Sequence, residues 1–284
     1  MKVLIIGADG QLGSDLLKIF KSSQNEVAGL SRGDVDISRS ADAESAIKKI
    51  KPQIVINCAA IVDTERNELF PEEAFLVNSL GAFYVAKAAQ TIGATVVYIS
   101  TDYVFDGLKK YFTEKDTPNP LNVYGSSKLA GEYLTKIANP KNYIIRTSAL
   151  FGKGKGPKGN FVSRLLDKAR SGMEIKMVND QFTSPTYTVD LAKTIQKIIR
   201  KKLPYGVYHI TNQGSASWYG FGKEIIKLMK INSKIVGIKT DMSSSGIKRP
   251  MYSVLINHNL NQKKISLPSW QNSLARYLKE EDLI

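Results

Sequence analysis

The sequence is poor in cysteine and has no long apolar run, and both shortages narrow the class of protein. A single cysteine, Cys58, stands among 284 residues. One cysteine cannot close an intrachain disulfide, so we expect a reducing compartment, of which the cytoplasm is the simplest. No apolar run approaches the roughly 18 residues that a membrane-spanning helix needs, so no membrane anchor is expected. The apolar start at residues 3–6 is too short for a signal peptide, and a glycine turn follows it.

Acidic residues are also scarce relative to basic ones. The chain has 26 Asp and Glu against 40 Lys and Arg, which gives a net charge of +14. Such a balance suits nucleic acid or phosphate-bearing small molecules, and it is equally typical of a lysine-rich solvated surface. The charges are spread in pairs such as Lys48-Lys49, without zinc-finger spacing or an RNA-binding aromatic motif. Nucleic acid is therefore not expected as a partner.

Strand-like and helix-like segments alternate through the first half of the chain. Short β-branched runs predict strands, and the segments between them carry helical patterns, one of which predicts a helix over residues 71–92. The predicted strands cover residues 2–6, 27–30, 53–57, 94–100 and 142–147. This alternation predicts an α/β fold with a Rossmann-type doubly wound parallel sheet, in which residues 1–150 form the dinucleotide-binding domain.

The second half is expected to form a smaller α/β substrate-binding lobe over residues 151–284. The boundary is approximate, because elements of this half can return to the main sheet. A Gly/Lys-rich loop at residues 152–159 marks the exit from the first domain and is expected to be mobile. The loop either closes over a substrate diphosphate or serves as a plain linker.

A glycine turn follows the first predicted strand. Gly7, Gly10 and Gly13 have G-x-x-G-x-x-G spacing before a helix, which lets the backbone approach a pyrophosphate at the helix N-terminus. Ser31-Arg32 stands where a carboxylate would hold a ribose 2′-OH, and arginine suits a 2′-phosphate instead. We therefore expect NADPH, with NADH as the alternative. Asp36 either meets the adenine edge or caps a turn.

Tyr124 and Lys128 lie four residues apart, and therefore on one face of a predicted helix. A phenol is a weak acid at neutral pH unless a nearby cation favours the phenolate, and Lys128 could supply that charge. Thr101 follows Ser100 at the end of the fourth predicted strand. Its hydroxyl could bond to a substrate carbonyl while Tyr124 gives the oxygen a proton. This pattern predicts reduction of a ketone by hydride transfer.

Sequence blocks along nearly the whole chain resemble one known family. The blocks cover residues 7–13, 100–107, 120–125, 128–132, 146–148, 179–182 and 184–186, with Arg249-Pro250, Ser253 and Leu255 further on. The chain resembles the extended short-chain dehydrogenase/reductase superfamily, and within it most of all the dTDP-4-dehydrorhamnose reductases. The resemblance implies NAD(P)H-dependent reduction of the C4 keto group of a nucleotide-linked deoxysugar, most simply dTDP-4-dehydro-L-rhamnose to dTDP-L-rhamnose.

The resemblance also implies roles for individual residues. The catalytic set is Thr101, Tyr124 and Lys128. The residues expected to bind the cofactor are Gly7, Gly10, Gln11, Leu12, Gly13, Ser31, Arg32, Asp36, Asn57, Ala59, Ala60, Asn78, Tyr124 and Lys128. The residues expected to bind the substrate are Asp102, Tyr103, Asp180, Gln181 and Arg249. Cys58 is expected to be a small buried residue of the cofactor site.

The chain departs from the family pattern at two points. Ala149 stands where most of these reductases have tryptophan, which removes an aromatic platform for the sugar. Some members are dimers bridged by Mg²⁺, but the corresponding positions here look like Asp15 and Val189, and valine cannot ligate a metal. We expect no metal site, although a homodimer remains open. The alternatives are a nucleotide-sugar epimerase or dehydratase, or a non-catalytic regulatory subunit of methionine adenosyltransferase, which also resembles these reductases.

Overall fold

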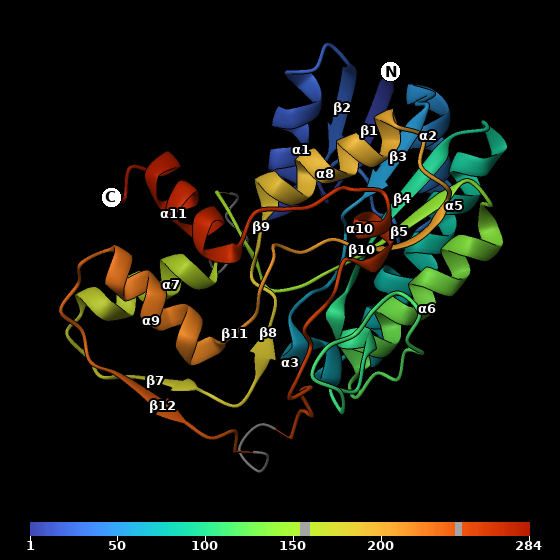
Figure 1. Ribbon diagram of the computed structural model, residues 1–284. Helices are drawn as coiled ribbons and strands as arrows, with labels where there is room; N and C mark the ends of the chain where they lie inside the picture. Colours follow the sequence, from blue (N-terminus) through green and yellow to red (C-terminus); the bar gives the residue numbers. More distant parts are fainter. Residues whose placement is uncertain (154–159, 242–245) are drawn as a thin grey trace.

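A computed structural model describes residues 1–153, 160–241 and 246–284 (Figure 1). Within these residues the main element is a six-stranded parallel sheet with the strand order β10-β5-β4-β3-β1-β2. Its strands are β1 (Lys2–Ile6), β2 (Glu26–Leu30), β3 (Ile54–Asn57), β4 (Thr95–Thr101), β5 (Asn142–Thr147) and β10 (Gly206–His209). The predicted doubly wound α/β fold is confirmed.

The two faces of the sheet bury separate apolar cores, because successive side chains of a strand point to opposite faces. Val3 and Ile5 of β1 pack in one core with residues of α1 (Gln11–Lys21) and α8 (Thr188–Arg200). Leu4 and Ile6 pack in the other with residues of α2 (Ser40–Ile50) and α5 (Ala82–Thr91). Such two-sided burial explains why these strands are apolar throughout.

The helix expected over residues 71–92 forms, but it contains a π-helical segment. It consists of α4 (Pro71–Phe75), the π-helix η1 (Leu76–Gly81) and α5. A π-turn inserts extra chain into the helical ladder and turns the following side chains, which is common at functional sites. Here it carries Asn78, whose side chain bonds to Ile61 and Ser127 instead of following the α-helical face.

The α6 helix (Val123–Ala138) packs against α5 and η1 on the same side of the sheet. It begins at Asn122, whose side chain accepts a hydrogen bond from the Gly125 N–H. The Glu68 side chain of α3 (Thr64–Leu69) accepts from the Val123 N–H. The short 3₁₀ turn η2 (Asp102–Val104) directly follows β4. These contacts bring the start of α6 against the carboxyl end of β4.

The second half of the chain divides its elements between the main sheet and a lobe of its own. β10 pairs with β5, and α8 packs against α1. The lobe has a separate apolar core that includes Phe151, Leu165, Phe221 and Trp270. Its elements are β6 (Leu150–Phe151), α7 (Phe161–Arg170), β7 (Ile175–Val178), β8 (Phe182–Thr183), β9 (Thr186–Tyr187), β11 (Ala216–Ser217), α9 (Trp218–Leu228), β12 (Ile235–Ile238) and α11 (Trp270–Glu280). The α10 helix (His258–Gln262) packs against β10 instead, and its Leu260 belongs to a core of the main sheet.

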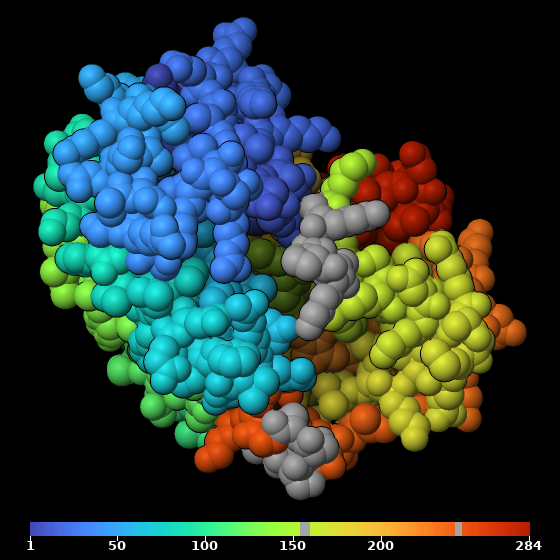
Figure 2. All heavy atoms as spheres, turned by 180° about the vertical axis from the view of Figure 1, so that it is seen from behind, coloured from blue at the N-terminus to red at the C-terminus, as the bar shows by residue number. Residues whose placement is uncertain are grey.

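A domain boundary near residue 150 remains a prediction. The greater part of the predicted Gly/Lys-rich loop, residues 154–159, lies outside the described residues. Figure 2 shows a hollow between the N-terminal half, in blue and cyan, and the yellow segment that contains α7. In the described part of the chain, no helix is both long enough and apolar enough to cross a bilayer.

Candidate functional site

The glycine turn fits tightly between β1, β3 and α1. Gly7 has a φ of +78°, and a Cβ added there would lie 2.9 Å from the Ala59 nitrogen. A Cβ on Gly13 would lie 2.1 Å from the Gly7 carbonyl oxygen. Both positions therefore exclude a side chain because of the protein's own backbone. Gly10 is the N-cap of α1 and offers no side-chain acceptor, so the first N–H groups of this helix are left for an anion.

A cavity of about 320 Å³ opens beside this turn. Its lining contains many of the predicted cofactor residues: Gly7, Gly10, Ser31, Arg32, Asp36, Ala59 and Ala60. It also contains Cys58, Arg66 and Glu73, and the last two form an ion pair of 2.7 Å. The remaining predicted cofactor residues, Gln11, Leu12, Gly13, Asn57, Asn78, Tyr124 and Lys128, lie outside this lining. Leu12 is instead a buried member of the core around α1, and Gln11 donates to the Gly152 carbonyl at 3.5 Å.

The loop after β2 contains Arg32, Asp34 and Asp36. Asp34 accepts hydrogen bonds from the N–H and the hydroxyl of Ser31, and these bonds lower the pKa of Asp34. Asp36 accepts from the N–H and hydroxyl of Ser38, which lowers the pKa of Asp36. Both carboxylates therefore cap turns. Arg32 is exposed and makes no hydrogen bond or ion pair with another described residue, so its guanidinium is available to a phosphate.

Two buried asparagines shape the wall near β3. Asn57 accepts from the Ala59 N–H at 3.1 Å, while its Nδ2 is buried without a partner in the described structure. An unpaired buried amide of this kind suits an acceptor on a bound molecule. Asn78 accepts from the Ile61 N–H at 2.8 Å and donates to the Ser127 hydroxyl at 3.0 Å. It therefore ties the segment after β3 to α6.

Thr101 and Tyr124 meet where β4 ends and α6 begins. A Cβ on Gly125 would lie 2.1 Å from the Tyr103 carbonyl oxygen, so only glycine allows this close approach. The Thr101 hydroxyl donates to Asp102 at 3.0 Å and accepts from the Tyr103 N–H at 3.2 Å. Burial raises the pKa of Tyr124 well above its ordinary value, although a hydrogen bond with Thr101 lowers it. The Tyr124 phenol is therefore protonated at neutral pH and able to act as a proton donor.

Lys128 lies one helical turn beyond Tyr124 and is only 2% exposed. Its ammonium lies over the Tyr98 ring, 4.2 Å from the centroid. Burial lowers the pKa of Lys128 to about 7, and the nearby Glu132 opposes this effect. Burial raises the pKa of Cys58 to about 12, and Lys128 opposes that shift. Cys58 is therefore a thiol rather than a nucleophilic thiolate.

A small pocket of about 40 Å³ lies next to Thr101 and Tyr124. Its lining brings together the predicted substrate residues Asp102, Tyr103 and Gln181, and it also contains Ala149, Phe182, Thr183, Trp218, Pro250 and Ser253. The ring of Tyr103 packs edge-on against Tyr124 with a centroid distance of 5.8 Å. Trp218, from the start of α9, gives this pocket an aromatic wall although Ala149 replaces the family's tryptophan.

The polar groups of the pocket are held by their neighbours. Asp102 accepts from the Ser148 hydroxyl at 2.7 Å, and burial raises the pKa of Asp102. Burial likewise raises the pKa of Tyr103 to about 12, although Arg249 lowers it by its charge and a hydrogen bond. Arg249 therefore joins the site through Tyr103.

Asp180 does not line this pocket. Its carboxylate accepts from the N–H of Thr240 at 3.1 Å and from the hydroxyl at 2.7 Å. Gln181 donates to the same hydroxyl at 3.0 Å. Asp180 thus anchors the segment that contains Thr240, while the neighbouring Gln181 reaches the pocket.

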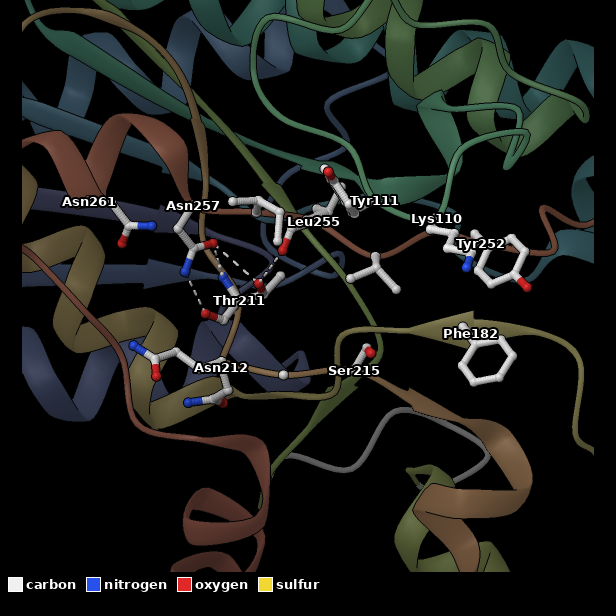
Figure 3. A pocket seen from close by; sticks show the side chains of 14 residues that line it. Lys110, Tyr111, Phe182, Thr211, Asn212, Ser215, Tyr252, Leu255, Asn257 and Asn261 are labelled. Atoms are coloured by element: carbon white, nitrogen blue, oxygen red, sulfur yellow. Dashed lines mark hydrogen bonds between the residues drawn. The ribbon is translucent and has the colours of Figure 1, made fainter.

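A larger cavity of about 440 Å³ contains none of the predicted site residues (Figure 3). Its floor is fixed by hydrogen bonds between Thr211 and Asn257, drawn as dashed lines in Figure 3. The stacked rings of Phe182 and Tyr252 form one wall, and Phe182 also lines the small pocket.

The positions that the resemblance aligns with a metal site do not gather ligands. Asp15 is buried, accepts from the Thr188 hydroxyl at 2.5 Å and has a raised pKa because of burial. Val189 packs against the apolar core of the lobe. Among the described residues, no group of three or more His, Cys, Asp or Glu side chains is placed to hold a metal ion. The absence of a metal remains a prediction.

A buried ionic group, to which no sequence pattern assigned a role, lies behind Thr101 and Tyr124. Glu132 accepts from the Ser100 hydroxyl at 2.6 Å and from two nitrogens of Arg146 at 2.8 and 2.7 Å. The available signal was the spacing, because Glu132 lies four residues after Lys128 and therefore near it on the helix.

Comparison with known proteins decides the family. Residues 1–283 match the family described as RmlD substrate binding domain. The chain belongs to this family.

Several known proteins match over nearly the full length. The spore coat polysaccharide biosynthesis protein SpsK of Bacillus subtilis is 36% identical over 280 residues, covering 98% of this chain and 97% of that protein. The crystal structure of a dTDP-4-dehydrorhamnose reductase from Clostridium acetobutylicum has 39% identity and a TM-score of 0.94, covering 99% of this chain and 100% of that one. The Bacillus anthracis dTDP-4-dehydrorhamnose reductase, solved in complex with NADP, has 36% identity and a TM-score of 0.93, covering 98% and 99%. The predicted resemblance is confirmed.

Proposed function

We propose that the protein is an NADPH-dependent oxidoreductase that reduces the C4 keto group of dTDP-4-dehydro-L-rhamnose to give dTDP-L-rhamnose. One observation carries the proposal. The protonated phenol of Tyr124, bonded to Thr101, lies next to a pocket that contains Tyr103. Lys128, on the same helix, lies near Cys58 in the wall of the cavity beside the glycine turn. A proton donor between two ligand sites is what ketone reduction by a nicotinamide requires. The names of the relatives support this substrate.

The residues around the larger of these two sites fit NADPH. The uncapped N-terminus of α1 suits a pyrophosphate, and Arg32, which pairs with no other described residue, suits a 2′-phosphate. Asp34 and Asp36, which could favour a free ribose hydroxyl, are already engaged in turns. The relative from Bacillus anthracis was solved with NADP. When bound, the cofactor supplies the hydride.

The residues of this chain then supply the proton and the orientation. The Thr101 hydroxyl, which donates to Asp102 in the structure, turns to donate its hydrogen bond to the ketone oxygen. Tyr124 gives that oxygen its proton as charge develops on it. The Lys128 ammonium stabilises the phenolate that remains. Asp102, Tyr103 and Gln181 hold the sugar, and Arg249 meets the nucleotide part of the substrate beside Tyr103. We place Asp180 behind this surface, where it supports Gln181 through Thr240.

The test is a turnover assay with the purified chain, NADPH and dTDP-4-dehydro-L-rhamnose prepared in the same vessel. We expect loss of the absorbance of reduced nicotinamide and, by mass spectrometry, a product two hydrogens heavier than the ketone. UDP-glucose serves as the control substrate and should give no product. Nicotinamide cofactor that remains bound through purification, together with conversion of UDP-glucose, would instead indicate an epimerase. Binding of NADPH without any turnover, and co-purification with methionine adenosyltransferase, would indicate a regulatory subunit.

The cytoplasmic location and the homodimer remain predictions. Fractionation of the source cells tests the first, and light scattering of the purified chain tests the second.

A further inference from the structure

The mechanism above uses Tyr124 and Lys128 but leaves the next polar residue on the same helix face unexplained. Glu132 is four residues beyond Lys128 on α6, and its side chain is 1% exposed. A buried carboxylate is costly unless it is paired and hydrogen-bonded. Glu132 meets both conditions, through a two-point ion pair with Arg146 of β5 and a bond from Ser100 of β4.

The bond from Ser100 links this carboxylate to the reacting groups. Ser100 immediately precedes Thr101, whose hydroxyl faces Tyr124. Arg146 is itself held over the Phe105 ring, 5.1 Å from its centroid, and is 3% exposed. Glu132, itself held by Arg146, therefore fixes the last residues of β4 against α6.

Few ionisable groups face Lys128 from the elements packed around it. On α6 itself they are Tyr124 and Glu132, on β4 the ring of Tyr98, and after β3 the Cys58 thiol. The η1 segment contributes no ionisable side chain. The Arg146 guanidinium pairs with the Glu132 carboxylate, and Glu68 of α3 bonds at the start of α6. Glu132 is thus the carboxylate that faces this lysine.

We propose that Glu132 is a positioning residue of the site: it holds the end of β4 through Ser100 and keeps the Lys128 side chain cationic beside Tyr124. The catalytic meaning of this inference rests on the proposed function. The electrostatic part does not, because it concerns only the charge of Lys128. Burial alone would favour a neutral amine, and the first opposing influence on the pKa of Lys128 is Glu132.

The first measurement is the titration of Lys128 itself. The chain is labelled with ¹³C at lysine Cε, and the Lys128 signal is assigned by its loss in Lys128→Met. We expect a midpoint near 7 in the wild type and a midpoint lower by about one pH unit or more in Glu132→Gln, which keeps the shape but removes the charge. Glu132→Asp retains the charge and should recover most of the shift. Ser100→Ala removes only the hydrogen bond and should leave the midpoint unchanged.

The second measurement is turnover of the sugar substrate as a function of pH. The activity of Glu132→Gln should fall with rising pH at least about one unit earlier than that of the wild type, which is a roughly tenfold loss above both midpoints. At a pH below both midpoints the two activities should approach each other. Ser100→Ala should lower kcat at every pH without moving the profile. A merely structural role for Glu132 would lower activity uniformly.

The possible results separate this inference from the proposed function. An unchanged Lys128 midpoint in Glu132→Gln overturns the inference even if the enzyme is active. Absence of turnover in the wild type overturns the proposed function, while the titration still decides whether Glu132 holds the charge. If Glu132→Gln does not fold, the wild type decides: a Lys128 midpoint at about 5–6, the range of buried lysines without a counter-charge, contradicts the inference.

Discussion

Replacement of Gly131 by alanine should destabilise the protein although alanine is the better helix former. Gly131 lies in the middle of α6, where it faces η1 and β4. An added Cβ would lie 2.3 Å from both the Asn78 carbonyl oxygen and the Tyr98 hydroxyl, and 2.8 Å from the Tyr98 Cζ. These two oxygens are hydrogen-bonded to each other at 2.8 Å. The Cβ therefore has to separate α6 from η1 and β4 or break that bond.

The expected size of the effect follows from three contributions. Overpacking of a well-packed interior costs about 1–3 kcal/mol. Loss of the buried bond between Tyr98 and Asn78 costs about 1–3 kcal/mol more. The helix propensity of alanine returns about 1 kcal/mol. We expect a net loss of about 1–5 kcal/mol, together with weaker NADPH binding because Asn78 supports the wall of the cofactor cavity.

Gly220→Ala in α9 is the matched control, since its Cβ would meet only the Ser217 hydroxyl oxygen at 3.4 Å. It should leave stability unchanged or raise it by up to about 1 kcal/mol. Urea unfolding followed by circular dichroism compares both variants with the wild type. A Gly131→Ala protein as stable as the wild type would refute the close packing of α6 against Asn78 and Tyr98.

Three further predictions concern single residues. Because burial raises the pKa of Cys58 to about 12 from 9.0, a thiol reagent at pH 8 should modify it roughly a thousandfold more slowly in the native chain than in urea; equal rates would contradict the assignment. Burial lowers the pKa of His209 to about 3 from 6.5, so the unfolded state binds the extra proton in that interval. The neutral imidazole's contribution to stability is therefore complete above pH 6.5 and is lost towards pH 3, by up to about 1.4 kcal/mol per pH unit. His209→Gln should flatten the slope of the unfolding free energy against pH, as measured by urea unfolding. An equally steep slope would exclude His209 as its source. Arg32→Ala should raise the Kd for NADPH by roughly tenfold to hundredfold and leave that for NADH nearly unchanged, as measured by nicotinamide fluorescence; an equal effect on both cofactors would remove Arg32 from the 2′-phosphate site.

The sheet could be predicted from the sequence because short segments of the chain carry the pattern of each strand and turn. Strands buried on both faces are apolar throughout, and a glycine turn between such a strand and a helix has few other uses. The positions of Thr101 and Tyr124 followed from the same order of elements, since the carboxyl ends of parallel strands share one edge. In the structure the two side chains are hydrogen-bonded to each other.

Other features depend on contacts that no local pattern contains. Apolar periodicity does not reveal the π-helix at Leu76–Gly81. The change in hydrogen-bond spacing covers only six residues, and the segments on either side still have a helical pattern. Trp218 enters the sugar pocket from a segment about 70 residues beyond Ala149. Asp180 sits in the family's block beside Gln181, yet its carboxylate bonds to Thr240. Residue type and spacing identify these side chains but not the direction in which they point.

The central claim is that Tyr124 protonates a ketone reduced by NADPH in this site, and single-turnover kinetics test it most directly. Enzyme and NADPH in excess are mixed with dTDP-4-dehydro-L-rhamnose, and nicotinamide oxidation is followed for the wild type and Tyr124→Phe. At saturating NADPH we predict a single-exponential loss of reduced nicotinamide for the wild type and a rate constant lower by roughly 10²–10⁴ for the variant. A Tyr124→Phe rate close to that of the wild type would contradict the account.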